Sequence, residues 1–146
     1  IRAGLKEIAL KPTVEVFAEP GRVLVAEACS LLVQVQLRKD DQLYINDGIY
    51  GSLSEMAQVD LRMPARLIRI GGGASETARA FVLNGPTCDS LDVLPGTFEL
   101  PEDAREGDWI EIGQVGAYSY ALATRFNGFY PETFVEVKDA PPAHTS

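Results

Sequence analysis

The sequence predicts a mainly β domain of the barrel or sandwich type. Its dominant hydrophobic period is two residues, and apolar and polar side chains alternate most clearly over residues 31–38. The alternating segments are short and are bounded by Gly, Pro, Asn or Asp, which is typical of strands. The 146 residues suit one domain, and 46% hydrophobic against 23% charged residues is an ordinary globular composition.

The predicted elements follow one another with little helix between them. Residues 4–10 have the pattern of a helix end that stops before Pro12, because proline disfavours helical geometry in the residue that precedes it. Short helical turns are expected at 53–57 and 116–122. In all we expect about seven to nine strands. Those that the pattern locates are 13–18, 31–38, 42–46, 65–70, 79–83, 108–112 and 133–137.

The first 28 residues differ from the rest of the chain in the order of their predicted elements. A helix end, a strand, a glycine-containing turn and the apolar run 23–28 follow one another as in a βα unit. We therefore expect residues 1–28 to be the remnant of a preceding α/β domain and residues 29–138 to be the β domain. The Pro-containing tail 139–146 is expected to be loose.

Charge and cysteine content exclude several classes of function. Thirteen basic against 21 acidic residues give a net charge of −8, which disfavours binding to nucleic acid or to an anionic membrane. No apolar run approaches the roughly 20 residues of a membrane span, so we expect a soluble protein. Cys29 and Cys88 are too few for a disulfide scaffold and suit a reducing compartment, which favours the cytoplasm.

The only histidine of the sequence, His144, lies in the tail. The folded part therefore has no histidine to serve as the base for a Ser or Cys nucleophile. Two cysteines and one tail histidine also cannot form a closed zinc site, and no metal is expected.

Two strings carry candidate chemistry. In the Glu-Pro-Gly-Arg string at 19–22, Gly21 permits close approach of a ligand, Arg22 offers a fork suited to phosphate, and Glu19 offers a carboxylate for a ring-nitrogen proton. An ordinary turn is the simpler explanation of that string alone. At 85–92, Cys88 and Asp89 suggest a proton-donating thiol beside an amine-binding carboxylate. A small buried cysteine and a turn-capping aspartate explain them as well.

Other features carry less chemistry. The glycines at 71–73 indicate a hairpin loop, since no clear helix follows to complete a phosphate site. Tyr50 and Tyr118 follow glycine-rich turns and are either pocket linings or packing residues. Trp109, Phe126 and Phe129 are expected in the core.

Six strings occur in one fixed order, at 19–22, 44–52, 85–92, 107–109, 116–118 and 126–129. Together they resemble the C-terminal part of the pyridoxal-phosphate-dependent ornithine/diaminopimelate/arginine decarboxylases, over about residues 13–137. The resemblance implies the C-terminal β-barrel or sandwich domain of a fold-type III decarboxylase. It also implies that residues 1–28 are the last unit of the cofactor-binding (β/α)8 barrel.

The resemblance implies a role for each candidate residue. Glu19 would keep the pyridine nitrogen of pyridoxal 5′-phosphate protonated, so that the ring works as an electron sink. Gly21, Arg22 and the Tyr118 hydroxyl would hold the phosphate. Cys88 would act from the opposite subunit of a homodimer in protonation at the substrate α-carbon. Beside it, Asp89 would bind the distal amine, and Tyr50 would line the pocket near the interface.

The string at 88–90 bears on the substrate. Cys-Asp-Ser followed by Leu91 resembles the ornithine branch more than the Cys-Glu-Ser of diaminopimelate-type members. This implies conversion of ornithine or lysine to a diamine and CO2. The second substrate-binding Asp of ornithine-type members has no match at 55–60, where Asp60 is out of register. Two alternatives stay open: a catalytically inactive regulatory or binding homologue, and a diaminopimelate decarboxylase.

The resemblance places the Schiff-base lysine on an early strand of the barrel. None of the four lysines matches that position; they are Lys6, Lys11, Lys39 and Lys138. We therefore expect the chain to be inactive and unstable alone, and to act beside the barrel of a longer, homodimeric protein on a small basic amino acid.

Overall fold

The computed structural model describes residues 2–8, 10–11, 13–59 and 61–138. Its strands are β1 (Leu31–Lys39), β2 (Gln42–Ile45), β3 (Ala65–Ile68), β4 (Ala78–Asn84), β5 (Phe98–Pro101) and β6 (Trp109–Ile112). The helices are α1 (Arg2–Glu7), α2 (Arg22–Val25), α3 (Ser54–Gln58) and α4 (Ser119–Leu122), with 3-10 turns η1 (Ala26–Ala28) and η2 (Phe126–Gly128). In this described part no helix has the length and apolar character to cross a membrane.

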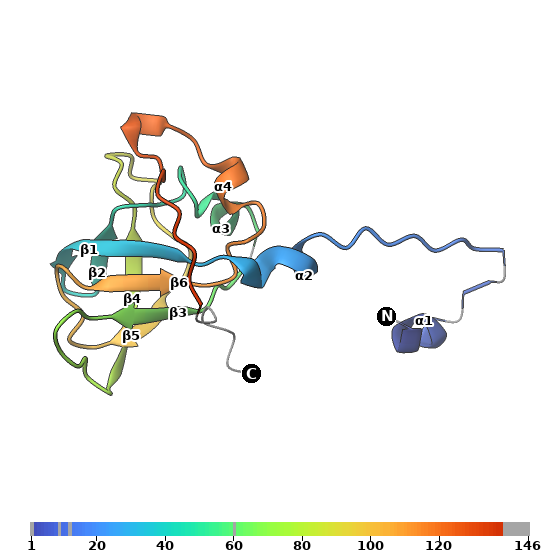
Figure 1. The fold of residues 1–146 in the computed structure, drawn as a ribbon, viewed down its shortest axis with the longest axis horizontal. Helices are drawn as coiled ribbons and strands as arrows, with labels where there is room; N and C mark the ends of the chain where they lie inside the picture. Colours follow the sequence, from blue (N-terminus) through green and yellow to red (C-terminus); the bar gives the residue numbers. More distant parts are fainter. Residues whose placement is uncertain (1, 9, 12, 60, 139–146) are drawn as a thin grey trace.

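The six strands form one sheet in the order β3-β6-β1-β2-β4-β5. Neighbouring strands are antiparallel, except that β2 and β4 are parallel. The two outermost strands, β3 and β5, contact each other, so the sheet curls into a nearly closed barrel (Figure 1). The predicted mainly β fold is confirmed.

The barrel interior follows from the two-residue period of the strands. In β1, Val33 and Val35 are buried while the polar residues between and beyond them face outward. The other strands contribute alternate apolar residues in the same way, and α3 closes one part of the core with Met56. The largest buried core side chains from the strands are Leu43, Ile45, Phe81, Leu83, Leu100, Ile110 and Ile112.

Five of the seven located strands are confirmed to within one or two residues, as β1, β2, β3, β4 and β6. Strand β5 was not predicted, because prolines close to both of its ends mask an otherwise regular alternation of buried Phe98 and Leu100. The strands predicted at 13–18 and 133–137 are wrong, and the described residues hold six strands rather than seven to nine. Neither segment has a neighbouring strand in the described part to satisfy its backbone hydrogen bonds.

The N-terminal segment runs as an extended arm from the sheet domain to α1 (Figure 1). Helix α1 confirms the predicted helix end, and the apolar run 23–28 is helical, as α2 and η1. The assignment of residues 1–28 to a preceding barrel stays a prediction. The tail 139–146, with His144, and Asp60 lie outside the described residues.

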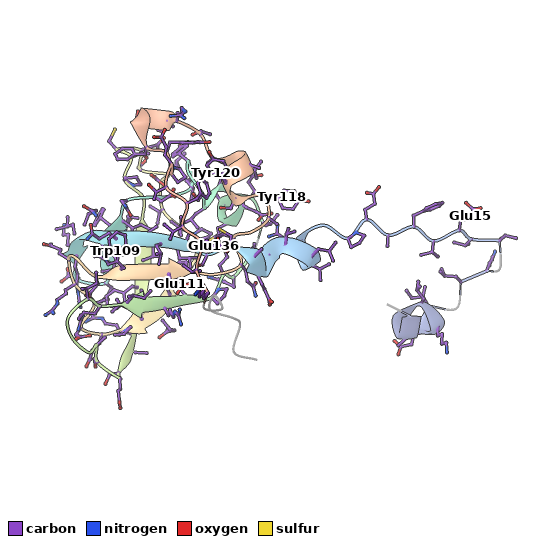
Figure 2. The ribbon with its side chains drawn as sticks, in the orientation of Figure 1. Glu15, Trp109, Glu111, Tyr118, Tyr120 and Glu136 are labelled. Atoms are coloured by element: carbon purple, nitrogen blue, oxygen red, sulfur yellow. The ribbon has the colours of Figure 1, made fainter. Side chains whose placement is uncertain are left out.

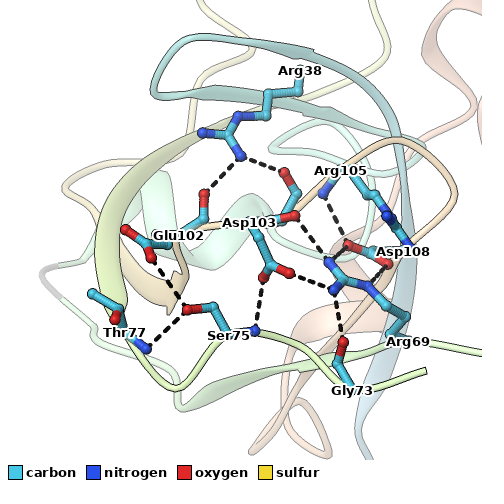
Figure 3. A network of polar contacts seen from close by, with 10 residues as sticks. Arg38, Arg69, Gly73, Ser75, Thr77, Glu102, Asp103, Arg105 and Asp108 are labelled. Carbon is cyan, nitrogen blue, oxygen red and sulfur yellow. Dashed lines mark hydrogen bonds and ion pairs between the residues drawn. The ribbon is translucent and has the colours of Figure 1, made fainter.

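A polar network joins the glycine-rich loop between β3 and β4 to the loop between β5 and β6 (Figure 3). The buried Arg69 guanidinium donates to both carboxylate oxygens of Asp108 at 2.8 Å and to the backbone oxygen of Gly73 at 3.0 Å. Asp103 also accepts from Arg69 at 2.6 Å and from the backbone of Ser75 at 2.9 Å. The glycine-rich loop is thus held by the chain itself, as expected of a structural hairpin loop.

Candidate functional site

A buried carboxylate joins the two loops that carry the candidate substrate residues. Oδ1 of Asp92 accepts the backbone N–H of Ile49 at 3.0 Å, and Oδ2 accepts the backbone N–H and hydroxyl of Thr87 at 3.1 and 2.7 Å. Asp92 is only 2% exposed. It thereby fixes the loop after β2 against the loop after β4.

Two glycines make that approach possible. A Cβ atom on Gly48 or on Gly85 would overlap the carboxylate of Asp92, and a Cβ on Gly48 would also meet the Gly85 backbone. The glycines of the two strings are therefore required because the loops pass each other at backbone distance.

Tyr50 and Asp89 meet across this junction. The Tyr50 hydroxyl donates to Oδ2 of Asp89 at 2.7 Å, and the backbone N–H of Leu91 donates to Oδ1 at 2.9 Å. These two hydrogen bonds, first that of Leu91 and then that of Tyr50, hold the pKa of Asp89 below its usual value. The same bond to Asp89 raises the pKa of Tyr50. The pair therefore presents an ionised carboxylate beside a neutral phenol.

Cys88 is exposed and lies next to a third loop. The Asn127 side-chain amide donates to the Cys88 sulfur at 3.7 Å, and Asn127 adopts a left-handed backbone conformation with φ of 54°. Phe126 lies against the Tyr50 ring at a centroid distance of 4.5 Å. The loop is anchored by Thr124, whose backbone N–H and hydroxyl donate to the Tyr50 carbonyl oxygen at 2.9 and 2.8 Å.

Phe126 and Phe129 are exposed, so their expected place in the core is wrong. Trp109 is only half-buried on β6. Phe126 and Asn127 are instead site residues that the sequence interpretation missed, although the Phe-Asn-Gly-Phe string at 126–129 was among the signals. Cys88 and Asp89 also line an open hollow, together with Gln36 and Tyr44.

A second cluster surrounds Arg22. Its guanidinium forms an ion pair with Glu55 on α3 and lies over the Tyr118 ring, 5.1 Å from the centroid. The Gly21 Cα faces the Tyr118 hydroxyl, and a Cβ built there would lie 3.6 Å from that oxygen. Figure 2 shows Tyr118 beside α2, where the arm meets the sheet domain. The structure thus brings Gly21, Arg22 and Tyr118 together.

Backbone contact holds this second cluster in place. The backbone N–H of Gly116 donates to the Ala26 carbonyl at 3.0 Å, and a Cβ on Gly116 would overlap the Val25 carbonyl oxygen. The turn that carries Tyr118 is therefore pressed against α2 and η1. The residue itself has a left-handed backbone, with φ of 63°.

The remaining candidate, Glu19, is not brought into either cluster. It is exposed on the arm, as is its neighbour in the same segment, Glu15, which Figure 2 labels. The two clusters are joined through residues 46–58, which carry Tyr50 at one end and Glu55 at the other. Within the described ranges no group of three His, Cys, Asp or Glu side chains is placed to hold a metal ion.

The chain is similar to known proteins over most of its length. The family model described as pyridoxal-dependent decarboxylase, C-terminal sheet domain, matches residues 23–116. The chain is 37% identical over 131 residues to an ornithine decarboxylase of Schizosaccharomyces pombe, which covers 81% of this chain and 30% of that protein. It is 36% identical over 132 residues to antizyme inhibitor 2 of Xenopus laevis, covering 80% of this chain and 28% of that one.

A solved structure shows the same fold. The lysine/ornithine decarboxylase of Vibrio vulnificus, complexed with putrescine, is 37% identical with a TM-score of 0.64, over 87% of this chain and 34% of that chain. The chain spans about a third of the length of these relatives. Because the family match covers more than half of the chain and all six strands of the sheet, the chain belongs to the pyridoxal-dependent decarboxylases of the ornithine, diaminopimelate and arginine group, as their C-terminal sheet domain.

Proposed function

We propose that the chain is the C-terminal domain of a homodimeric decarboxylase that converts L-ornithine, or lysine, to a diamine and CO2. The single observation that carries the proposal is the Tyr50–Asp89 pair, a carboxylate held ionised at an accessible loop. The identity to an ornithine decarboxylase over most of the chain supports it. The two free cysteines, Cys29 and Cys88, suit a cytoplasmic location, which we propose as well.

Asp89 is the proposed partner of the distal amine. Each of its oxygens accepts one hydrogen bond from the protein and keeps a lone pair for a further donor. Since its pKa is lowered, the carboxylate stays ionised into more acidic solution than an ordinary aspartate, and at neutral pH it faces a diamino acid whose distal amine is an ammonium group. A fixed, ionised carboxylate is suited to a cationic amine rather than to a substrate end that carries its own carboxylate.

The second cluster fits the phosphate of pyridoxal 5′-phosphate. Arg22 is one-third exposed and Tyr118 about half, so a cation and a phenol hydroxyl are both accessible beside the Gly21 backbone. This is a donor set suited to an oxyanion. When bound, the cofactor supplies the electron sink for loss of CO2. Glu19, on the arm, is the proposed partner of its ring nitrogen.

Cys88 is the proposed proton donor at the substrate α-carbon, in the active site of the partner subunit. Its exposed thiol projects from a loop that Asp92 fixes on one side and that Asn127 contacts on the other. A thiol held in this way is positioned for proton transfer. The lysine that binds the cofactor is proposed to lie in the barrel of the same longer protein.

A second candidate function is that of a non-catalytic binding homologue. The observation that favours it is the 36% identity to a protein named antizyme inhibitor 2. Against it, four of the residues to which the family resemblance gives a role are present: Glu19, Arg22, Cys88 and Asp89.

The test is CO2 release by the full-length protein from ornithine, lysine and diaminopimelate, with and without pyridoxal 5′-phosphate. We expect turnover of ornithine or lysine and an increase of at least about tenfold in KM for Asp89→Asn. Asp40→Asn, in the β1–β2 turn, is the matched control and should leave KM unchanged. Absence of turnover with all three substrates would leave the binding homologue, and preference for diaminopimelate would contradict the role given to Asp89.

A further inference from the structure

Glu55 is a buried acid to which the proposed reaction assigns no role. Its side chain is 11% exposed, while that of its partner Arg22 is 33% exposed. One carboxylate oxygen, Oε1, meets the Arg22 guanidinium, and the other, Oε2, is buried without a hydrogen-bond partner in the described part of the chain. A glutamate is seldom buried unless it is paired, and half of this carboxylate is left unsatisfied.

The position of Glu55 in the fold does not require an acid. It lies on α3 between Leu53 and Met56, both of which are in the core. Apolar residues of similar size commonly stabilise such a position at least as well as an ion pair, because an ion pair must be desolvated. The carboxylate is therefore better explained by what it does to Arg22 than by its effect on stability.

The geometry shows what that effect is. The Arg22 guanidinium is held on one edge by Glu55 and on one face by the Tyr118 ring, at 5.1 Å. A guanidinium has five N–H donors in a fixed plane, and the Glu55 contact uses only the Nη2 group. These two contacts fix the plane of the Arg22 guanidinium. Its remaining N–H groups therefore point away from Glu55, on the accessible side of the guanidinium.

We propose that Glu55 is a positioning residue for Arg22, which it orients so that the free N–H groups of the guanidinium meet the phosphate of the cofactor. The inference rests on the proposed role of Arg22. Glu55 acts through the place of its Oε1 acceptor rather than through its charge, because a second negative charge near a phosphate opposes binding.

Position and charge can be separated with two substitutions. Glu55→Gln keeps the acceptor oxygen at the same chain length and removes the charge. Glu55→Asp keeps the charge but withdraws the carboxylate by one methylene group. Glu111→Gln is the matched control, because Glu111 is also buried and paired with an arginine, Arg66 at 2.6 Å, and with Ser30 at 2.7 Å.

The measurement is the affinity of the full-length apo protein for pyridoxal 5′-phosphate and for pyridoxal, by equilibrium titration of cofactor absorbance. The ratio of the dissociation constant for pyridoxal to that for pyridoxal 5′-phosphate isolates the contribution of the phosphate. We expect Glu55→Asp to reduce this ratio by about tenfold, and Glu55→Gln and Glu111→Gln to stay within about threefold of the wild type. The melting temperature of each variant shows separately whether the fold is retained.

An unchanged or larger ratio in Glu55→Asp overturns the proposal, as does a large loss in Glu55→Gln with none in Glu55→Asp. If Glu55→Asp does not fold, Glu55→Gln still tests the proposal. A loss of about tenfold in the ratio there assigns the effect to charge and overturns the proposal. Arg22→Ala tests the underlying proposal independently. If the ratio in Arg22→Ala equals that of the wild type, Arg22 does not bind the phosphate.

Discussion

The hydroxyl of Tyr50 donates to Oδ2 of Asp89 across 2.7 Å and joins two strings that are 39 residues apart in the sequence. The bond contributes to the lowered pKa of Asp89, after the larger contribution of the Leu91 backbone N–H. Since the pKa of Asp89 is lowered, the site keeps its negative charge as the pH falls below the usual range for an aspartate. Loss of that charge is expected only at the folded-state pKa.

Tyr50→Phe removes one of the two hydrogen bonds that hold Asp89. We expect KM for the diamino acid to rise about threefold with little change in kcat, because the Leu91 N–H still positions the carboxylate. The pKa of Asp89 should move back toward its usual value, so the rise of KM in acid should begin at a higher pH than in the wild type. Steady-state kinetics across pH measure both effects. Tyr130→Phe is the control, and an equal effect in that variant would contradict the prediction.

Asn127→Gly tests the contact between Asn127 and Cys88. Glycine accepts the left-handed backbone at this position, so the substitution removes the amide without adding backbone strain. We expect the rate of Cys88 alkylation to rise about twofold to threefold, because loss of the Asn127 side chain leaves the sulfur more accessible to the reagent. Peptide-level mass spectrometry after timed labelling gives the rate. Cys29, also exposed, is the internal control in the same sample.

Asn127→Ala separates the side chain from the backbone. An alanine in the left-handed region costs about 1–2 kcal/mol, so this variant should be less stable than Asn127→Gly while showing the same Cys88 labelling rate. Identical labelling of Cys88 in wild type and both variants would show that Asn127 does not restrain the thiol.

Asp108→Asn should weaken the barrel itself. Asp108 is 3% exposed and accepts both the Arg69 guanidinium and the Arg105 backbone N–H, so the substitution leaves the buried Arg69 without one ionic partner. We expect a loss of about 3 kcal/mol in the free energy of unfolding of the full-length protein. Urea denaturation measures it. Glu132→Gln, in the exposed pair with Arg125, should change stability by little.

The same network gives a pH dependence. Burial raises the pKa of Asp108, but the hydrogen bonds and charge of Arg69 outweigh it, so that the pKa is lowered overall. The stabilisation is therefore present above the unfolded-state pKa and is lost as the pH falls through the folded-state pKa. Unfolding midpoints measured from neutral to acid pH should fall more steeply in the wild type than in Asp108→Asn.

Each strand that was predicted correctly has a partner strand among the described residues. Residues 31–38 alternate clearly, and β1 pairs with β2 on one side and β6 on the other. Residues 13–18 alternate as well, yet Phe17 is 83% exposed and the segment lies beside no strand of the described structure. A period of two shows that a segment suits a sheet, but it does not show where a partner strand is.

Part of the candidate site was likewise predicted from the sequence and part was missed. Gly21, Arg22 and Tyr118 were predicted to share one ligand, and they lie together, as do Cys88, Asp89 and Tyr50. Glu55 carried no sequence signal, since an acid in a short helix is ordinarily a surface residue. Its proposed role depends on the ion pair with Arg22, which links α3 to α2 and which no local pattern contains. Asn127 was missed because its role depends on a left-handed turn that returns to Cys88.

The apolar surface of the arm leads to the last prediction, that residues 1–146 alone do not form a stable monomer. Val23 and Leu24 on α2 are 81% and 72% exposed. Phe17 on the arm is 83% exposed, and Val135 near the C-terminal end is 75% exposed. Exposed apolar groups of this extent mark surfaces that another part of a protein covers, and they otherwise promote association. We expect the isolated chain to bind a hydrophobic dye and to sediment as a mixture of oligomers, whereas the full-length protein does neither. Replacing Phe17 and Leu24 by Ser should reduce dye binding by the isolated chain but lower the stability of the full-length protein. A monomeric isolated chain with cooperative unfolding and no dye binding would contradict the need for a covering domain.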